Sequence, residues 1–310
     1  MRKVLVRVLP WVVTAAILAF LFSRIPVHQV LAAARNAAGW FVPAIAGIIC
    51  VVYLADSFAV WKTFGWFVTP MGLVETLTLR GATYLLALIN YSLGQGAFVF
   101  FLNRTRRVPV MRAAAAVLLI IGINLLTLLF FSTFGVLFGA ETPPHLNAVI
   151  AIAYAGLAVY VVILLLKPRF LARWPIFDVL IEAGLTGHLK ALAVRVPHVL
   201  TLLVMYHVGL HAFGVQTPLF ATLIAVPFVL LLAVLPISFQ GLGPSQGALI
   251  FFFSKYASGD GAARSAQVLA AGLGIQAIAW CVQIAIGLAC TRSQLGRTLR
   301  QGAKEIPSAA

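Results

Sequence analysis

Two polar, glycine-rich segments interrupt long apolar stretches of the chain, at residues 90–96 and 236–246. If each stretch folds as a helical hairpin, the returning helix starts near Gln95 or Gln246 with its free N–H groups inside the membrane. A helix N-terminus is a ready anion site, and glycine lets a ligand approach the backbone closely. The alternative is that these glycines only allow tight turns against neighbouring helices. The candidate substrate-binding residues are Arg80, Asn90, Ser92, Gly94, Gln95, Gly96, Ser238, Gln240, Gly241, Gly243, Ser245 and Gln246.

Arg80 is a charged residue inside the first of these stretches, roughly 10 Å along its leg at about 1.5 Å per residue. A charge at that depth is costly unless it is paired or hydrated. As a ligand-binding residue, Arg80 would contact a phosphate beside Asn90 and Gln95. As a structural residue, it would form an ion pair with Glu75 or Asp56. The sequence leaves both interpretations open.

The remaining polar residues predict neither catalysis nor metal binding. Asp56 lies shortly before Lys62, which predicts an ion pair near the membrane surface. His207 and His211 have a spacing that metal sites use, but no third ligand is near in sequence, so hydrogen bonds between helices are expected. Asn124 is expected to act in the same way. Because no nucleophile clusters with His and carboxylates, and no phosphate loop is present, no catalytic residue and no cofactor are predicted.

The composition requires a lipid environment for the elements that carry these residues. Hydrophobic residues make up 62% of the 310 residues, charged residues make up 9%, and the mean hydropathy is +1.05. A soluble domain has roughly 25% charged residues. The composition therefore excludes an ordinary soluble globule and predicts a single integral membrane domain, residues 1–310.

A membrane-spanning helix needs about 20 apolar residues, and the chain contains six such runs beside the two interrupted stretches. The predicted fold is all-α, with six transmembrane helices and two re-entrant hairpins. A segment at 175–195 that mixes apolar and charged residues is expected to lie in the interface plane, and 291–310 is expected to be a basic cytoplasmic tail. The predicted spans are 4–22, 38–60, 113–139, 146–166, 196–215 and 265–290, and the hairpins are 73–102 and 218–253.

The net charge of +15 follows from this topology, without a nucleic acid partner. With the N- and C-termini in the cytoplasm, 17 basic residues fall on the cytoplasmic side and four on the other, as the positive-inside rule expects. The cytoplasmic face is then expected to attract anionic lipid. The 17 are Arg2, Lys3, Arg7, Lys62, Arg104, Arg106, Arg107, Arg112, Lys167, Arg169, Arg173, Lys190, Arg195, Arg292, Arg297, Arg300 and Lys304, and the four are Arg24, Arg35, Lys255 and Arg264.

The two parts of the chain repeat the same order of elements with opposite orientation. Residues 1–139 and 146–290 each contain two spans, a hairpin and a span, so the halves form an inverted repeat. The heptapeptide QGAFVFF at 95–101 matches QGALIFF at 246–252 in five of seven positions. Inverted repeats with paired broken helices commonly place a substrate site near the membrane midplane.

At these motifs the chain resembles the membrane region of lysylphosphatidylglycerol synthases and the flippase-like integral membrane proteins related to it. The resemblance runs from about residue 10 to 290. It is carried by 235–248 (LPISFQGLGPSQGA), by 90–96 with the basic residues Arg104–Arg112 behind it, and by 213–227. Gln95 and Gln246 stand where the family has Glu, and Tyr91-Ser92 replaces its proline, which argues against a proton- or cation-coupled carboxylate mechanism.

The resemblance implies a multi-pass protein of the bacterial cytoplasmic membrane that moves an anionic or bulky lipid between leaflets by alternating access. The expected partners are the lipid substrate and a lipid-modifying enzyme. The alternative is a membrane-embedded transferase or accessory subunit that acts on lipid-linked sugars or aminoacyl lipids. That alternative requires an acid or base near the hairpins, where this chain has Gln95 and Gln246.

Overall fold

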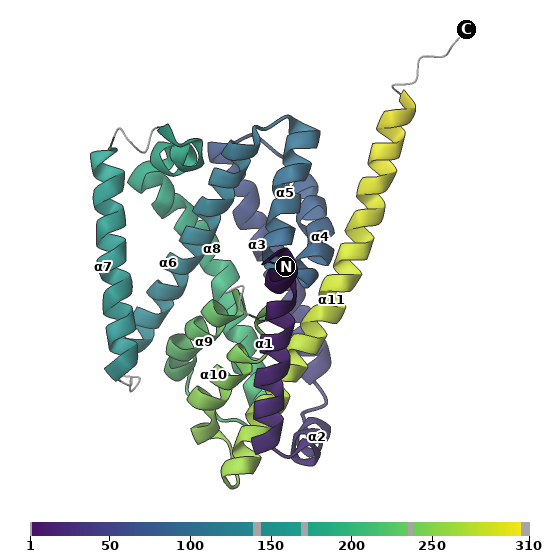
Figure 1. Cartoon of the computed structure of the whole chain (residues 1–310), viewed down its shortest axis with the longest axis vertical. Coiled ribbons are helices and arrows are strands. Elements are labelled where there is room, and N and C mark those ends of the chain that lie inside the picture. The colour runs from purple at the N-terminus through teal and green to yellow at the C-terminus, as the bar shows by residue number, and fades with distance from the viewer. Residues whose placement is uncertain (1, 139–143, 169–172, 235–237, 305–310) are drawn as a thin grey trace.

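A computed structural model describes residues 2–138, 144–168, 173–234 and 238–304 (Figure 1), and over these residues the chain is helical with no strand. The all-α prediction is confirmed. Short 3₁₀ turns lie at Pro175–Phe177 (η2), Phe239–Gly241 (η3) and Ser254–Tyr256 (η4). The α-helices are α1 (Arg2–Arg24), α2 (Val27–Arg35), α3 (Phe41–Phe67), α4 (Leu73–Ile89), α5 (Tyr91–Arg106), α6 (Val110–Leu137), α7 (Pro144–Leu166), α8 (Asp178–Ala212), α9 (Leu219–Val234), α10 (Pro244–Phe253) and α11 (Gly261–Lys304).

Five of the described helices are long and apolar enough to cross a membrane: α3, α6, α7, α8 and α11. A sixth span arises if Trp11–Arg24 and Val27–Arg35 count as one, although they are bent by 86°. Pro26 sits at that bend with an extended ψ of 128°, and a proline disfavours helix in the residue before it, which ends α1. The protein is a multi-pass helical membrane protein, and its first predicted span continues into a helix with a different direction.

Both interrupted stretches fold as helical hairpins. The first hairpin is α4 and α5, which reverse at Asn90, and the second is α9 and α10. Figure 1 shows the first hairpin in the upper part of the molecule and the second in the lower part, so the two enter from opposite ends. The order of elements around each hairpin is the same, with α3 before and α6 after the first, and α8 before and α11 after the second. This arrangement is the predicted inverted repeat.

The returning helices begin earlier than predicted. Asn90 has extended dihedral angles and its side chain accepts a hydrogen bond from the Ser92 N–H at 2.8 Å, so Asn90 caps α5 and the helix begins at Tyr91. In the second hairpin Gly243 adopts a φ of 95° and Pro244 is the first helical residue, a position for which proline is preorganised. The predicted start near Gln95 is therefore wrong, because its amide lies inside the helix.

The segment predicted to lie in the interface, 175–195, divides at a kink at Gly184, and only its part after Gly184 is continuous with the span that follows. Helix α8 runs through 195–196 without a break, and its one non-helical residue is Gly184, with φ 54° and ψ −171°. Helix α11 likewise continues to Lys304, through most of the predicted tail.

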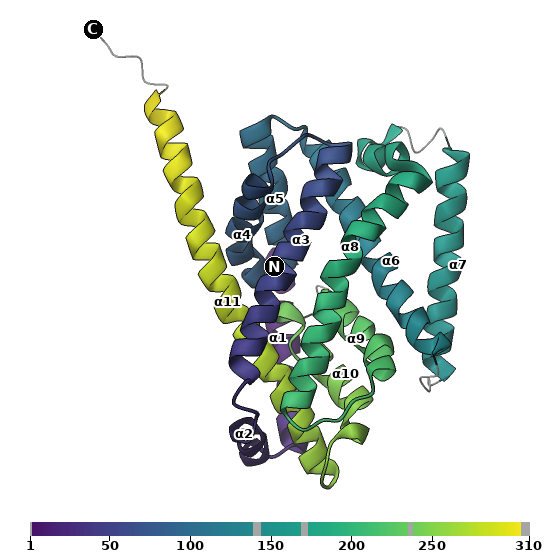
Figure 2. The ribbon, with the colours of Figure 1, turned by 180° about the vertical axis from the view of Figure 1, so that it is seen from behind.

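Helices α3 and α8 pack along each other through the centre of the bundle, as Figure 2 shows. Helix α11 packs equally closely on α4, where small residues allow the approach: a β-carbon on Gly81 would lie 2.4 Å from the Cys290 sulfur, and one on Gly287 would lie 2.7 Å from Leu85. Small residues at such contacts are typical of membrane helix pairs. The packing brings α3, α4 and α8 to one region, where the charged residues described below meet.

Candidate functional site

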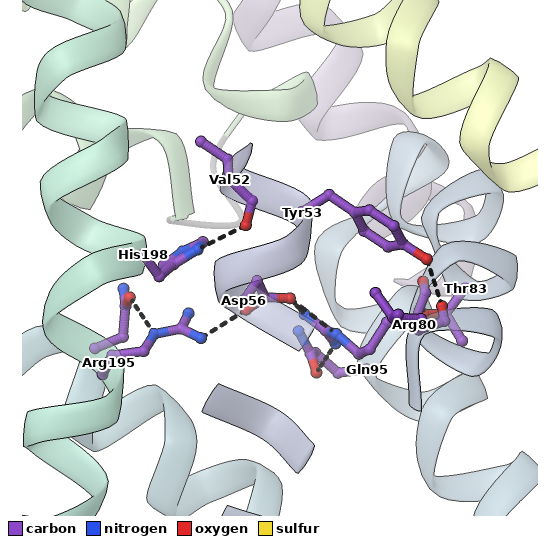
Figure 3. Close-up of polar contacts among 10 residues, drawn as sticks. Val52, Tyr53, Asp56, Arg80, Thr83, Gln95, Arg195 and His198 are labelled. Carbon is purple, nitrogen blue, oxygen red and sulfur yellow. Dashed lines mark hydrogen bonds and ion pairs between the residues drawn. The ribbon is translucent and has the colours of Figure 1, made fainter. Parts of the chain in front are cut away.

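Asp56, on α3, lies between two arginines in the interior of the bundle (Figure 3). Its Oδ2 accepts hydrogen bonds from Arg80 Nε at 3.0 Å and Nη2 at 2.5 Å, and its Oδ1 accepts one from Arg195 Nη1 at 2.6 Å. The exposed fractions of the three side chains are 3% for Asp56, 11% for Arg80 and 8% for Arg195. All three are nearly removed from solvent, so their charges interact strongly. We call these three residues the charged cluster.

Amide side chains hold the guanidinium groups of the charged cluster in place. Arg195 Nε donates to Asn124 Oδ1 on α6 at 3.1 Å, and Arg80 Nη1 donates to Gln95 Oε1 on α5 at 3.5 Å. On the same side of α8, His198 lies 3.3 Å from the Val52 carbonyl oxygen. Asn124 thus forms the interhelical hydrogen bond that its sequence position predicts. Neutral amides orient the arginines without adding a negative charge.

The charged cluster carries one more positive charge than negative. Two guanidinium groups face one carboxylate, and the other ion pairs among the described residues, Glu75 with Arg106 and Glu182 with Arg112, lie elsewhere at more exposed positions. An ionisable residue within a membrane segment is expensive and marks a functional position by default. The surplus positive charge can be offset by an anion that enters the bundle.

The structure shows the ion pair with Asp56 that the structural interpretation of Arg80 predicts. Arg80 forms the ion pair with Asp56 and also reaches Gln95, whereas Glu75 pairs with Arg106 at the end of α5. The predicted pair of Asp56 with Lys62 is wrong. The Lys62 ammonium lies 4.2 Å from the ring centroid of Trp61, and Asp56 points into the bundle on a different face of α3.

Arg195 is the residue of this site that sequence reasoning missed. It was expected on the cytoplasmic surface, and its burial removes it from the 17 basic residues on that side. A signal was present, because Arg195 and Asp56 are opposite charges that each lie within or beside a long apolar run. Opposite charges inside apolar runs predict a buried pair.

The tips of the two hairpins meet. Gln240 Nε2, in the second tip, donates a hydrogen bond to the Ala87 carbonyl in the last turn of α4. The Phe239 N–H donates to Thr14 Oγ1 on α1 at 2.8 Å. The backbone at Gly241 has a φ of 73°, and a β-carbon there would lie 2.4 Å from the Ala233 Cα. Gln240 therefore joins the two hairpins, and Gly241 allows a close approach within the second one.

Two other predicted residues of the second hairpin, Ser245 and Gln246, bond to each other. Ser245 Oγ lies 2.7 Å from Gln246 Oε1 and 2.5 Å from the Gly241 carbonyl oxygen, and Gln246 is fully buried. Ser238 Oγ is buried with no hydrogen-bond partner. Of the twelve predicted residues, Arg80 belongs to the charged cluster and Gln95 bonds to Arg80. The others cap or pack the hairpin turns, apart from Gly96, beside which there is open space.

Gly94→Val is expected to lower the free energy of unfolding by about 1–3 kcal/mol, the usual cost of overpacking. A β-carbon on Gly94 would lie 2.6 Å from the Ala87 β-carbon, so the two legs of the first hairpin would have to separate. Gly96→Val is the matched control, because nothing lies within 4 Å of its β-carbon. Thermal unfolding in one detergent measures both, and equal midpoints would contradict the close packing at Gly94.

Comparison with known protein families, with curated proteins and with solved structures finds no match for this chain. Among the residues that the structure describes, no three His, Cys, Asp or Glu side chains lie close enough together to hold a metal ion. His207 lies 3.0 Å from Thr222 Oγ1, and His211 lies 3.0 Å from the Thr217 carbonyl oxygen. The charged cluster and the paired hairpins are the features from which a function can be argued.

Proposed function

We propose that the protein moves an anionic lipid between the leaflets of the bacterial cytoplasmic membrane by alternating access, with both termini in the cytoplasm. The observation that carries this proposal is the surplus positive charge of the charged cluster, buried at the junction of the two halves. The resemblance of the hairpin motifs to flippase-like membrane proteins supports the same function.

Arg195 has the geometry to bind a phosphate. Its Nε and Nη1 atoms are engaged with Asn124 and Asp56, while no hydrogen bond joins its Nη2 to another described residue. A guanidinium binds a phosphate through parallel N–H donors. A phosphate that approaches Nη2 would compete with Asp56 for Arg195.

This competition would couple binding to movement of the halves. Asp56 and Arg80 belong to the first half, and Arg195 belongs to the second. The ion pair between Asp56 and Arg195 holds α3 against α8. An anion that takes the place of Asp56 beside Arg195 breaks the ion pair between α3 and α8. The anion would then bind the separated arrangement more tightly than the paired one, and such a difference in affinity is what shifts a conformational equilibrium.

In proteoliposomes, labelled phosphatidylglycerol is expected to change leaflet at least about tenfold faster than labelled phosphatidylcholine, which corresponds to about 1.4 kcal/mol of selectivity. The reason is that phosphatidylglycerol carries a net negative charge, whereas the choline group of the second lipid neutralises its phosphate. Loss of fluorescence on addition of a membrane-impermeant reductant measures the movement. Equal rates for the two lipids, or rates equal to those of protein-free vesicles, would contradict the proposal.

A further inference from the structure

A large apolar cavity lies between α6, α7, α8 and α9, away from the charged cluster. Its volume is about 610 Å³, within the range of roughly 300–1,000 Å³ that ligand pockets occupy. Leucine, isoleucine and valine dominate its lining, which includes Leu125 and Leu128 of α6, Ile150 of α7 and Phe228 of α9. Its polar side chains are few, and two of them, Tyr160 and His188, bond to each other.

Two facing glycines make room in this cavity. Gly122 lies on the α6 wall and Gly156 lies on the α7 wall, and nothing lies within 4 Å of the β-carbon that either could carry. Most glycines that serve helix packing in this chain have a neighbour in that position, as Gly81 and Gly287 do. The glycines of the cavity therefore leave space unfilled.

Helix α7 forms the outer wall of the cavity, which is open to the surroundings of the bundle, since Val149, Ala153 and Gly156 of its lining are exposed. Only 6% of its most apolar window is buried, and Figure 1 shows α7 at the edge of the molecule. A hydrogen bond of 2.7 Å between Tyr160 on α7 and His188 on α8 spans the space, and a second cavity of about 260 Å³ lies beside it and shares both residues. The space on both sides of this bond lies between apolar helices of the bundle.

We infer that the cavity seats one hydrocarbon chain of a membrane lipid. An apolar void loses the dispersion contacts of its lining, and water cannot fill it because few polar partners are present. Lipid chains are the apolar molecules that surround α7 in a membrane, and a flexible hydrocarbon chain suits an apolar space of this volume between helices. The inference does not depend on transport, since occupation of the cavity can be measured without lipid movement.

Leucine at either glycine is expected to expel the chain. The full-length protein in detergent micelles is mixed with phosphatidylglycerol that carries a diazirine in one acyl chain, irradiated and digested. Label is expected on the residues of α6, α7, α8 and α9 that line the cavity, and unlabelled phosphatidylglycerol is expected to compete for it. Gly122→Leu and Gly156→Leu should each lower this label at least about tenfold, the loss expected when roughly two methylene groups of the chain are no longer buried.

Gly47→Leu is the matched control, because Gly47 lies on α3, outside the cavity, and also has nothing within 4 Å of its β-carbon. It should leave the label unchanged. Since leucine favours a helix over glycine, all three variants should fold, and their thermal unfolding midpoints check this. Label that persists in both cavity variants, or label that unlabelled lipid does not displace, would overturn the inference.

Discussion

Arg195→Gln is expected to abolish selective movement of anionic lipid while the protein remains folded. Removal of Arg195 leaves Asp56 paired with Arg80, so the buried charge falls from +1 to zero. A neutral buried pair needs no external anion, and the desolvation cost of the second guanidinium disappears. Asp56 keeps its ion pair with Arg80, and the lower desolvation cost offsets the lost bond between Asp56 and Arg195, so the variant should stay folded. Its thermal unfolding midpoint separates the effect on function from any effect on folding.

The expected size of the functional loss follows from the hydrogen bond that disappears. A bond to a charged group contributes about 1.5–3 kcal/mol, which corresponds to a reduction of roughly 10- to 150-fold in binding of the anion. Movement of labelled phosphatidylglycerol in proteoliposomes measures it. Arg112→Gln is the control, because Arg112 pairs with Glu182 at a more exposed position, with 36% of its side chain accessible. Retained selectivity in Arg195→Gln would show that Arg195 does not bind the lipid.

The membrane fold could be predicted from the sequence because its signals are local. Apolar runs of about 20 residues identify the spans, and the polar break at 90–96 identifies the first hairpin. The signals that set the helix starts were also local: Asn90 is a favoured N-cap residue and Pro244 a favoured first residue. Asn90 and Pro244, and not Gln95 and Gln246, mark the helix starts that the structure shows.

The place of Arg195 in the charged cluster was harder to predict than the pair of Arg80 with Asp56, because its contacts join residues far apart in the chain. Asp56 and Arg195 are separated by 139 positions, and no periodicity relates them. Hydropathy placed the edge of a span beside Arg195, since Lys190 and His188 precede it and lower the local average. The same pattern describes a charge at the membrane surface and a charge that a second helix neutralises. Only the packing of α3 against α8 distinguishes the two.

Asp56→Asn is expected to produce the largest loss of stability of any single change in the charged cluster, about 3–5 kcal/mol, the cost of a buried charge that has lost its partner. The substitution keeps the shape of the side chain but leaves Arg80 and Arg195 together with no carboxylate between them. Their mutual repulsion adds to the cost of burial. A large fall in the thermal unfolding midpoint in detergent is the measurement.

The double variant Asp56→Asn/Arg195→Gln tests whether charge is the cause. It buries one unpaired guanidinium where Asp56→Asn buries two, so it should be more stable than Asp56→Asn and less stable than Arg195→Gln. This rescue by a second substitution is the non-additivity expected of residues in one ion-pair network. Asp260→Asn is the isosteric control, because Asp260 is exposed at the start of α11 and accepts a hydrogen bond from the Ala263 N–H, and Asn caps a helix about as well as Asp. A double variant no more stable than Asp56→Asn would mean that shape, and not the balance of charge, holds α3 against α8.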